Sequence, residues 1–366
     1  MKKVRDSNFE LMRINSMFLI VIYHFIILMG GNLINLTEGK LNSLITLICF
    51  ITVVHVNSFI LVTGYFQYNK KINIKKIISL VFMVYFYKVV ITLIFMKFNI
   101  CNYGTLDLYK AFSPLEMDNY WFIKCYLLLY ILSPYINIVI KKLNQKEHKN
   151  LIILLFVLFS IIPTVTNQRT FSNIGFSTIH FIYVYLIGSY FAKYPLKNNI
   201  HFKNYSSKKT AIILFSLFIA FGLIRFLMYE YCSKILTTTD GTLLFELRNI
   251  IINNIYNYQT PLLIFQSVCY FLFFETFKFK SKIINTISSC IFSIYLITEN
   301  NSIKKILYKW LGIGKEIIHA NMLPRIFFYC ILIMIAGIVI ELVRKQITRL
   351  IIFIYKSLEK KIKTIN

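Results

Sequence analysis

Acidic residues are scarce in this sequence of 366 residues, where 15 Asp and Glu stand against 41 Lys and Arg. Charged residues of both signs make up only 15% of the chain, and 57% of it is apolar, whereas about 25% charge is usual in a soluble domain. The net charge of +26 suits a nucleic-acid-binding protein, but the basic residues form short clusters between apolar runs, as in cytoplasmic loops of membrane proteins. No zinc-finger or helix-turn-helix spacing occurs, and we expect no nucleic-acid partner.

Cysteine, glycine and proline are also used sparingly. The seven cysteines stand singly without a Cys-x-x-Cys pair, so we expect no metal or redox centre. With 12 glycines, 6 prolines and no internal repeat, the chain lacks the usual signs of a transporter built from repeated halves with broken helices. The sequence also lacks four motifs of soluble enzymes, namely a Gly-rich phosphate loop, an HxxxxD acyltransferase motif, a GxSxG elbow and an HExxH motif. Their absence excludes the soluble enzyme classes that carry them.

What the sequence has in abundance is long apolar segments. A membrane-spanning helix needs about 20 mostly apolar residues, and the chain is long enough for ten of them with little left for a soluble domain. The sequence therefore predicts an all-α, polytopic bundle of about ten transmembrane helices within residues 1–343, followed by a basic cytoplasmic or interfacial tail at 344–366. The apolar segments cover residues 9–29, 43–66, 77–95, 120–140, 151–165, 176–192, 210–227, 260–277, 284–299 and 325–342.

The basic residues orient this bundle. Counted over alternate loops, 26 Lys and Arg lie on the side of the two termini and 11 on the opposite side, while four fall inside spans. Because cytoplasmic loops carry the excess of Lys and Arg, we expect both termini in the cytoplasm. The first apolar run carries Arg13 and His24 and has no small-residue cleavage site after it, so it is interpreted as a retained helix and not a signal peptide.

The first helix holds the richest set of ionisable residues. Ionisable side chains inside a bilayer are costly and mark candidate functional sites. At about 100° per residue, Glu10, Arg13 and His24 share one narrow face, and Glu10 and Arg13 form a favourable i, i+3 pair. A rise of about 1.5 Å per residue puts His24 roughly 16 Å beyond Arg13. A purely structural reading, with a snorkelling Arg13 and a hydrogen-bonded His24, is the alternative.

Other candidates are less distinctive. His55 and Asn57 fall near the middle of the second span, where bridging between helices is as good an explanation as a binding role. The lysine cluster of the 67–76 loop is basic enough to bind a phosphorylated ligand, although positive-inside topology is the stronger explanation for it. This lysine cluster consists of Lys70, Lys71, Lys75 and Lys76. Glu299 lies at an outer span end, where solvent contact accounts for it.

Four motifs in order resemble the acyltransferase family 3 membrane proteins. The family shows an acid, Leu-x-Arg and a later His in helix one, then Asn-x-Phe with Ser-Gly-Tyr-Phe, then an aromatic start with a Leu-Ser-Pro end, then Tyr-Leu-Ile-His. Where the family has that last His, this chain has Thr298, and where some members have Arg-x-x-Arg it has only lysines. The matching residues are Glu10, Leu11, Arg13 and His24, then Asn57, Phe59, Thr63, Gly64, Tyr65 and Phe66, then Trp121, Ser133 and Pro134, then Tyr295, Leu296 and Ile297.

This resemblance implies a stand-alone O-acyltransferase in the plasma membrane of a bacterium. Such proteins move an acyl group, often acetyl, from cytoplasmic acetyl-CoA or another acyl-CoA to a hydroxyl of a polysaccharide or lipid-linked glycan. His24 would be the general base or a transient acyl carrier, with Arg13 and Glu10 as its catalytic partners. Arg13 and the four lysines would bind the donor, which is a substrate and no permanent cofactor. Candidate acceptor-binding residues are His55, Asn57 and Trp121.

Two other classes remain open on the residues alone. A flippase or transporter of a polar glycolipid would also place ionisable groups inside the membrane. A non-catalytic partner in glycan assembly would share the membrane topology without the chemistry. The acyl group, the acceptor hydroxyl and the oligomeric state are not encoded in any motif that we identify.

Overall fold

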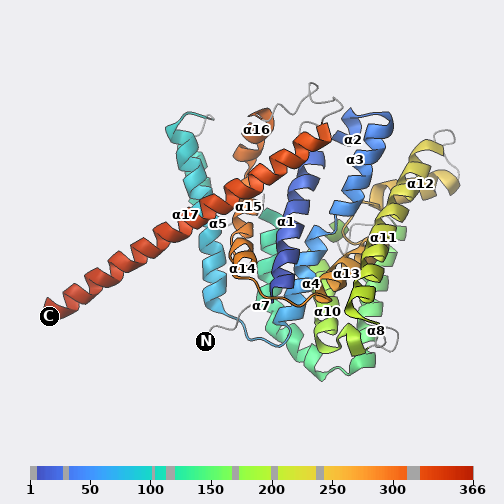
Figure 1. Ribbon diagram of the computed structural model, residues 1–366, viewed down its shortest axis with the longest axis horizontal. Helices are drawn as coiled ribbons and strands as arrows, with labels where there is room; N and C mark the ends of the chain where they lie inside the picture. The colour runs from blue at the N-terminus through green and yellow to red at the C-terminus, as the bar shows by residue number, and fades with distance from the viewer. Residues whose placement is uncertain are drawn as a thin grey trace.

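The computed structural model describes residues 6–27, 33–100, 104–112, 120–166, 173–198, 205–235, 243–310 and 322–365. In these ranges every regular element is a helix, which confirms the all-α prediction (Figure 1). The α-helices are α1 (Ser7–Ile27), α2 (Leu33–Leu36), α3 (Gly39–Thr52), α4 (His55–Gln67), α5 (Ile74–Lys97), α6 (Thr105–Phe112), α7 (Trp121–Lys142), α8 (Gln145–Phe156), α9 (Ile162–Val165), α10 (Thr178–Lys193), α11 (Ser207–Ile235), α12 (Leu243–Asn254), α13 (Pro261–Glu275), α14 (Lys282–Ser288), α15 (Ile291–Thr298), α16 (Asn301–Trp310) and α17 (Met322–Ile365).

Seven stretches of the described chain are long and apolar enough to cross a membrane, so the polytopic prediction is confirmed. Three of the ten predicted segments are shorter helical stretches, at α10, α13 and the pair α14–α15. The count of ten spans therefore stays a prediction. The seven stretches are Ser7–Ile27, Gly39–Gln67, Ile74–Lys97, Trp121–Lys142, Gln145–Val165, Ser207–Ser233 and Met322–Tyr355.

The connections between helices sort to the two ends of the bundle. The N-terminal end of α1 and the α4–α5, α7–α8 and α13–α14 connections lie at the lower end in Figure 1, whereas α2, α12 and α16 lie at the upper end. The count of Lys and Arg over alternate loops depends on this alternation of the connections between the two ends of the bundle. Which end faces the cytoplasm stays a prediction.

The second apolar segment is broken at its centre. Val53 and Val54 separate α3 from α4, and carbonyls in the last turn of α3 have no partner within their helix. Arg225 on α11 and the Gln266 side-chain nitrogen on α13 both donate to the carbonyl of Phe50, at 3.4 and 3.0 Å. A cation also complements the negative end of a helix dipole. The break is thus stabilised by side chains from two other helices.

Arg225 closes a second helix end in the same place. It is only 1% exposed, donates to the carbonyl of Ile255 just after α12, and donates at 2.8 Å to the side-chain oxygen of Gln266. Its guanidinium also lies 5.0 Å from the centroid of the Phe50 ring. These acceptors explain how a buried cation is tolerated, because a buried charge needs hydrogen bonds to replace its hydration.

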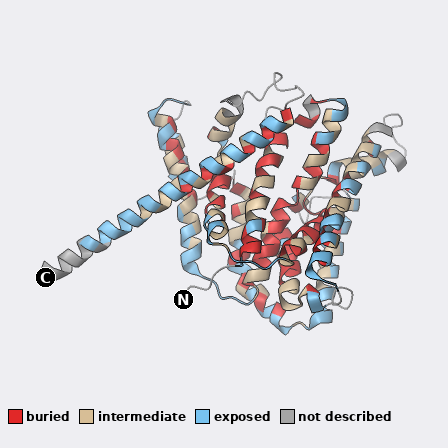
Figure 2. Cartoon of the chain, in the orientation of Figure 1, coloured by how far each residue is buried: buried red, intermediate tan, exposed pale blue. Residues whose placement is uncertain are grey.

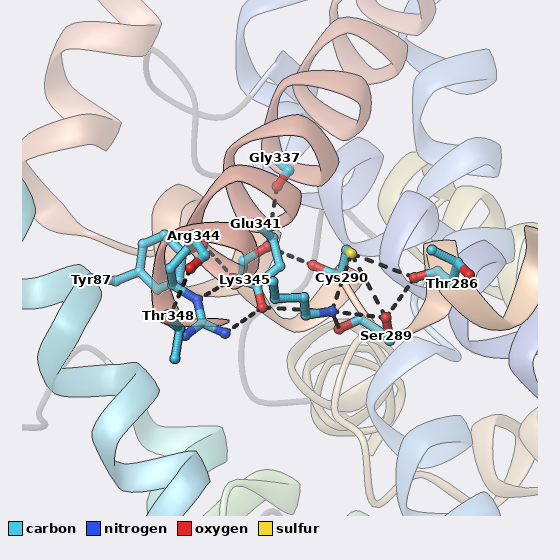
Figure 3. Close-up of polar contacts among 10 residues, drawn as sticks. Tyr87, Thr286, Ser289, Cys290, Gly337, Glu341, Arg344, Lys345 and Thr348 are labelled. Atoms are coloured by element: carbon cyan, nitrogen blue, oxygen red, sulfur yellow. Dashed lines mark hydrogen bonds and ion pairs between the residues drawn. The ribbon is translucent and has the colours of Figure 1, made fainter. Parts of the chain in front are cut away.

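The ninth apolar segment is broken in the same way, between α14 and α15. Lys345 on α17 donates to the carbonyl of Ser289 at 2.7 Å, again placing a cation at a helix C-terminus (Figure 3). One turn earlier, the buried Glu341 carboxylate accepts two hydrogen bonds from Arg344 and one from Tyr87 of α5, at 2.6 to 2.8 Å. These contacts attach α17 to α5 and to the broken helix.

Buried residues concentrate in the middle of the bundle, whereas α5 is buried at only a few positions and residues 342–355 of α17 are mostly exposed (Figure 2). α17 runs from Met322 to Ile365 without an interruption, and the predicted boundary between residues 343 and 344 has no counterpart in its backbone. The described part of its far end carries apolar side chains such as Phe353 at 71% exposure. The interfacial tail therefore stays a prediction, now as the continuation of a membrane helix.

α4 and α10 approach each other backbone to backbone. A Cβ added at Gly64 would collide with the carbonyl of Tyr185, and one at Gly188 would collide with the carbonyl of Leu61. Small residues permit such close approach between membrane helices. The Gly64 of the second-helix motif therefore has a packing role.

We expect Gly64→Ala to destabilise the protein by about 1–3 kcal/mol, the usual cost of overpacking a well-packed interior. The measurement is thermal unfolding of the purified protein in detergent. Gly104→Ala is the matched control, because a Cβ there meets no atom within 4 Å. Equal melting temperatures for the two variants would contradict the close packing of α4 on α10.

Candidate active site

Two cavities lie at different heights along α1. One, of about 560 Å³, is lined by Arg13 and Glu10 and is called the Arg13 cavity below. The other, of about 360 Å³, is lined by His24 and is called the His24 cavity. The predicted face of α1 therefore lines both cavities, with Glu10 and Arg13 in one and His24 in the other.

In the Arg13 cavity, the predicted pair is present, with Arg13 Nη1 at 3.1 Å from Glu10 Oε1. Glu10 is 5% exposed and also accepts a hydrogen bond from the hydroxyl of Ser288 at the end of α14. The carboxylate thus fixes Arg13 from one side, while the Arg13 side chain keeps 30% of its surface exposed and can bind a ligand.

The four candidate lysines divide into two pairs. Lys70 in the α4–α5 connection and Lys76 in the first turn of α5 line the Arg13 cavity. Lys71 in the connection and Lys75 in the first turn of α5 are exposed and are not part of its wall. Lys70 also lies 5.5 Å from the centroid of the Phe66 ring. The cavity wall carries three cations and the two acids Asp6 and Glu10, so its charge is mixed with an excess of positive groups.

In the His24 cavity, His24 lies against a carboxylate that the sequence did not predict as its partner. Its Nδ1 lies 2.7 Å from Oε1 of Glu299, the residue that follows α15. The contact does not meet hydrogen-bond geometry, but a carboxylate this close favours a proton on Nδ1, and Nε2 is then the basic nitrogen. A carboxylate that fixes the tautomer of a basic histidine is a recurring element of acyl-transfer sites.

Glu299 is buried, contrary to the expectation of solvent contact. It is 6% exposed, and Lys304 on α16 binds its second oxygen at 2.7 Å. Lys304 thus supplies a positive charge that compensates the burial of this carboxylate.

His55 faces the same cavity from the first turn of α4. It is 1% exposed, and neither ring nitrogen has a hydrogen-bond partner among the residues that the structure describes. Its ring centroid lies 6.4 Å from that of His24 and 5.8 Å from that of Tyr258. Both ring nitrogens of His55 are therefore free to bond a group that enters the cavity, and such a bond would offset the cost of burying the imidazole.

Three aromatic rings form a platform on the wall of the His24 cavity. Trp121 lies 4.3 Å from Phe176 and 6.0 Å from Tyr258, ring centre to ring centre, with the Tyr258 ring inclined by only 25°. Phe176 and Tyr258 are 5.1 Å apart. The predicted Trp121 is thus in the site, whereas Phe176 and Tyr258 were not predicted, because no motif in the sequence distinguishes them from other aromatic residues.

Asn57 does not line either cavity. Its side-chain nitrogen donates to the carbonyl of Tyr258 at 3.0 Å, and its oxygen lies 2.9 Å from Nε2 of His180. Gly175 (φ +94°) packs against the other side of Tyr258, where a Cβ would collide. The structure therefore gives Asn57 a positioning role for Tyr258, and direct contact with an acceptor stays a prediction.

The fold and these side chains define a polytopic helical membrane protein with a basic cavity and a histidine–carboxylate cavity along one helix. The family model described as an acyltransferase domain, that of acyltransferase family 3, matches residues 6–342. The chain therefore belongs to acyltransferase family 3 and is a membrane acyltransferase. No match was found among the curated proteins or among the solved structures.

We expect Glu299→Gln to reduce acyl transfer by about 10²-fold, the low end of the range for a group that supports acid–base catalysis. Glutamine keeps the size of the side chain and removes the charge that fixes the His24 tautomer. The measurement is turnover with saturating donor, because loss of a group that acts through His24 lowers kcat more than it raises KM.

Glu341→Gln is the control for this experiment, since Glu341 is an equally buried carboxylate outside both cavities. It removes a buried charge beside Arg344 and is expected to affect stability more than turnover. If the two variants lose activity only in proportion to lost folded protein, Glu299 has no role in the chemistry.

Proposed function

We propose that the protein is an O-acyltransferase, acetyl being the simplest acyl group, that uses cytoplasmic acyl-CoA to modify a hydroxyl of a polysaccharide or lipid-linked glycan. The observation that carries this proposal is the contact between His24 Nδ1 and Glu299, which leaves Nε2 as a base inside a cavity lined with aromatic rings. In this proposal both termini and the 67–76 loop face the cytoplasm of a bacterial cell.

The chemistry is a direct transfer. Nε2 of His24 accepts the proton of the acceptor hydroxyl while the oxygen of that hydroxyl attacks the thioester carbonyl carbon. The carbon–sulfur bond then breaks, and the coenzyme A thiolate leaves and takes the proton from the imidazolium. The same nitrogen could attack first and carry the acyl group to the acceptor, which gives the same products.

The donor would bind from the Arg13 cavity. Coenzyme A is polyanionic and cannot enter lipid, so its phosphates require basic groups at the membrane surface. Arg13, Lys70 and Lys76 provide such groups in the cavity wall, and the exposed Lys71 and Lys75 are their neighbours in the sequence. His24 lies roughly 16 Å further along α1, which leaves room for the extended arm of the coenzyme between them.

The acceptor would bind in the His24 cavity. A sugar ring presents apolar C–H groups that pack on aromatic faces, and the platform of Trp121, Phe176 and Tyr258 offers such faces. His55 would then form its missing hydrogen bond with the acceptor or with the developing oxyanion.

One observation favours a second candidate, a flippase of a polar glycolipid. Both broken helices, α3–α4 and α14–α15, have the discontinuous form that transporters use at substrate sites. In this chain, however, the freed carbonyls of Phe50 and Ser289 are bonded to cationic side chains and do not face a ligand. A non-catalytic role in glycan assembly would require no paired His24.

We expect His24→Ala and Arg13→Ala each to abolish acylation while the protein still reaches the membrane in normal amounts. Loss of one acid–base group costs about 10²–10⁴-fold in rate. The measurement is the acyl content of cell-surface glycan from cells with each variant, with membrane protein quantified in parallel. Near-normal acylation with His24→Ala would show that His24 is structural.

Purified protein in vesicles separates transfer from transport. With labelled acetyl-CoA on the side of the 67–76 loop and glycan acceptor on the other side, we expect label to appear as an oxygen ester on the glycan. Substituting Lys70 and Lys76 together by Gln should raise the KM for the donor more than it lowers kcat, because each lysine is expected to bind phosphate. Passage of unlabelled glycan without esterification would support the flippase.

A further inference from the structure

The two cavities are separated by a single helical turn. Three helices line both of them, and on each helix the residue of the Arg13 cavity lies four positions from the residue of the His24 cavity. Four residues advance a helix by about 6 Å, so the barrier is no thicker than one layer of side chains. The pairs are Arg13 and Met17 on α1, Thr63 and Phe59 on α4, and Tyr126 and Phe122 on α7.

Phe122 is at the centre of this layer. Its ring centroid lies 6.2 Å from Phe59, 6.0 Å from Tyr126 and 6.0 Å from Tyr295 of α15. Phe181 of α10 lies behind it at 5.4 Å. One side chain from α7 thus lies against rings from α4, α10 and α15 at the level between the two cavities.

The barrier has no charged side chain between Arg13 and the His24 pair. The residues at its two surfaces are Met17, Phe59, Thr63, Phe122 and Tyr126, none of which carries a charge at neutral pH. A phosphate group would lose its hydration there without compensation. A neutral thioester arm has no charge to remove from water. The barrier therefore discriminates between the charged phosphates and the uncharged arm of an acyl-CoA.

α7 adds a continuous aromatic face across the barrier. Phe122, Tyr126 and Tyr130 follow one another at four-residue spacing, and each neighbouring pair of rings is stacked within 16°. Phe122 lines the His24 cavity, whereas both tyrosines line the Arg13 cavity. The stacked rings therefore form one wall that extends from the first cavity to the second.

We propose that Phe122 is the gate between the two cavities, and that its ring moves aside to admit a neutral acyl-thioester arm from the Arg13 cavity to His24. The identity of the passing group rests on the proposed function. The gate itself rests on the cavity walls and ring contacts alone, so the two can be tested separately.

The first test measures access and uses no donor. In a variant without the seven native cysteines, Ile20→Cys places a thiol in the His24 cavity. A small membrane-impermeant methanethiosulfonate reagent is added to vesicles on the side of the Arg13 cavity, which Lys71→Cys labelling identifies. We expect Phe122→Ala to speed modification of the thiol about tenfold, which corresponds to stabilising the open state by about 1.4 kcal/mol. Phe122→Trp is expected to slow the modification.

Phe176→Ala is the matched control, because it removes a ring of the same size from the wall of the His24 cavity at the aromatic platform and not at the barrier. Access from the Arg13 side should stay at the parent rate in this variant. Equal acceleration in Phe122→Ala and Phe176→Ala, or no change with Phe122→Ala and Phe122→Trp, would overturn the gate.

The second test measures transfer with donors of increasing acyl length. We expect Phe122→Ala to raise the rate with a longer acyl-CoA relative to acetyl-CoA, since the ring no longer restricts the passage. Faster thiol access without acyl transfer in any variant would retain the gate and reject the proposed function. Acyl transfer by the parent protein, with thiol access and chain-length preference both unaffected by Phe122, would reject the gate alone.

Discussion

Backbone polar groups that lose their helical partner inside a membrane must find another one, and this requirement shapes the centre of the protein. Two apolar segments are broken, and in each a cation from a distant helix binds the freed carbonyl, Arg225 at Phe50 and Lys345 at Ser289. An unsatisfied carbonyl in hydrocarbon costs several kcal/mol, so these breaks are stable only with their caps. Each cap also joins helices that lie far apart in the sequence.

The breaks position the site. Because α3 ends at Thr52, His55 begins a new helix and faces the His24 cavity from its first turn. α1 is unbroken by contrast, and it holds Arg13 and His24 at a fixed separation in two different spaces. The ionisable groups of the proposed acyl-transfer site are thereby kept apart by an uncharged layer, with a polar mixed-charge cavity on one side and an aromatic one on the other.

Much of the fold follows from hydropathy. Within the described residues, all ten apolar segments coincide with helices, because burying backbone in lipid leaves helix formation as the main way to satisfy its polar groups. The i, i+3 pair of Glu10 and Arg13 was also predictable, since helix geometry fixes neighbours within one turn. The helix interruptions at Val53 and Ser289 were not predictable, because no proline or glycine marks them in the sequence. Their stabilising partners come from α11, α13 and α17.

The sequence by itself determined the membrane class, the helical segments and the family, since composition, periodicity and local motifs are properties of contiguous residues. It also selected His24 and Arg13, because ionisable groups are rare in apolar segments. Only the tertiary structure decided that Glu299 is the partner of His24, that Phe176 and Tyr258 complete the aromatic platform, and that Asn57 supports Tyr258 from outside the cavity. The physical reason is that these contacts join segments far apart in the chain, and helix packing, which local periodicity does not encode, sets which of them meet.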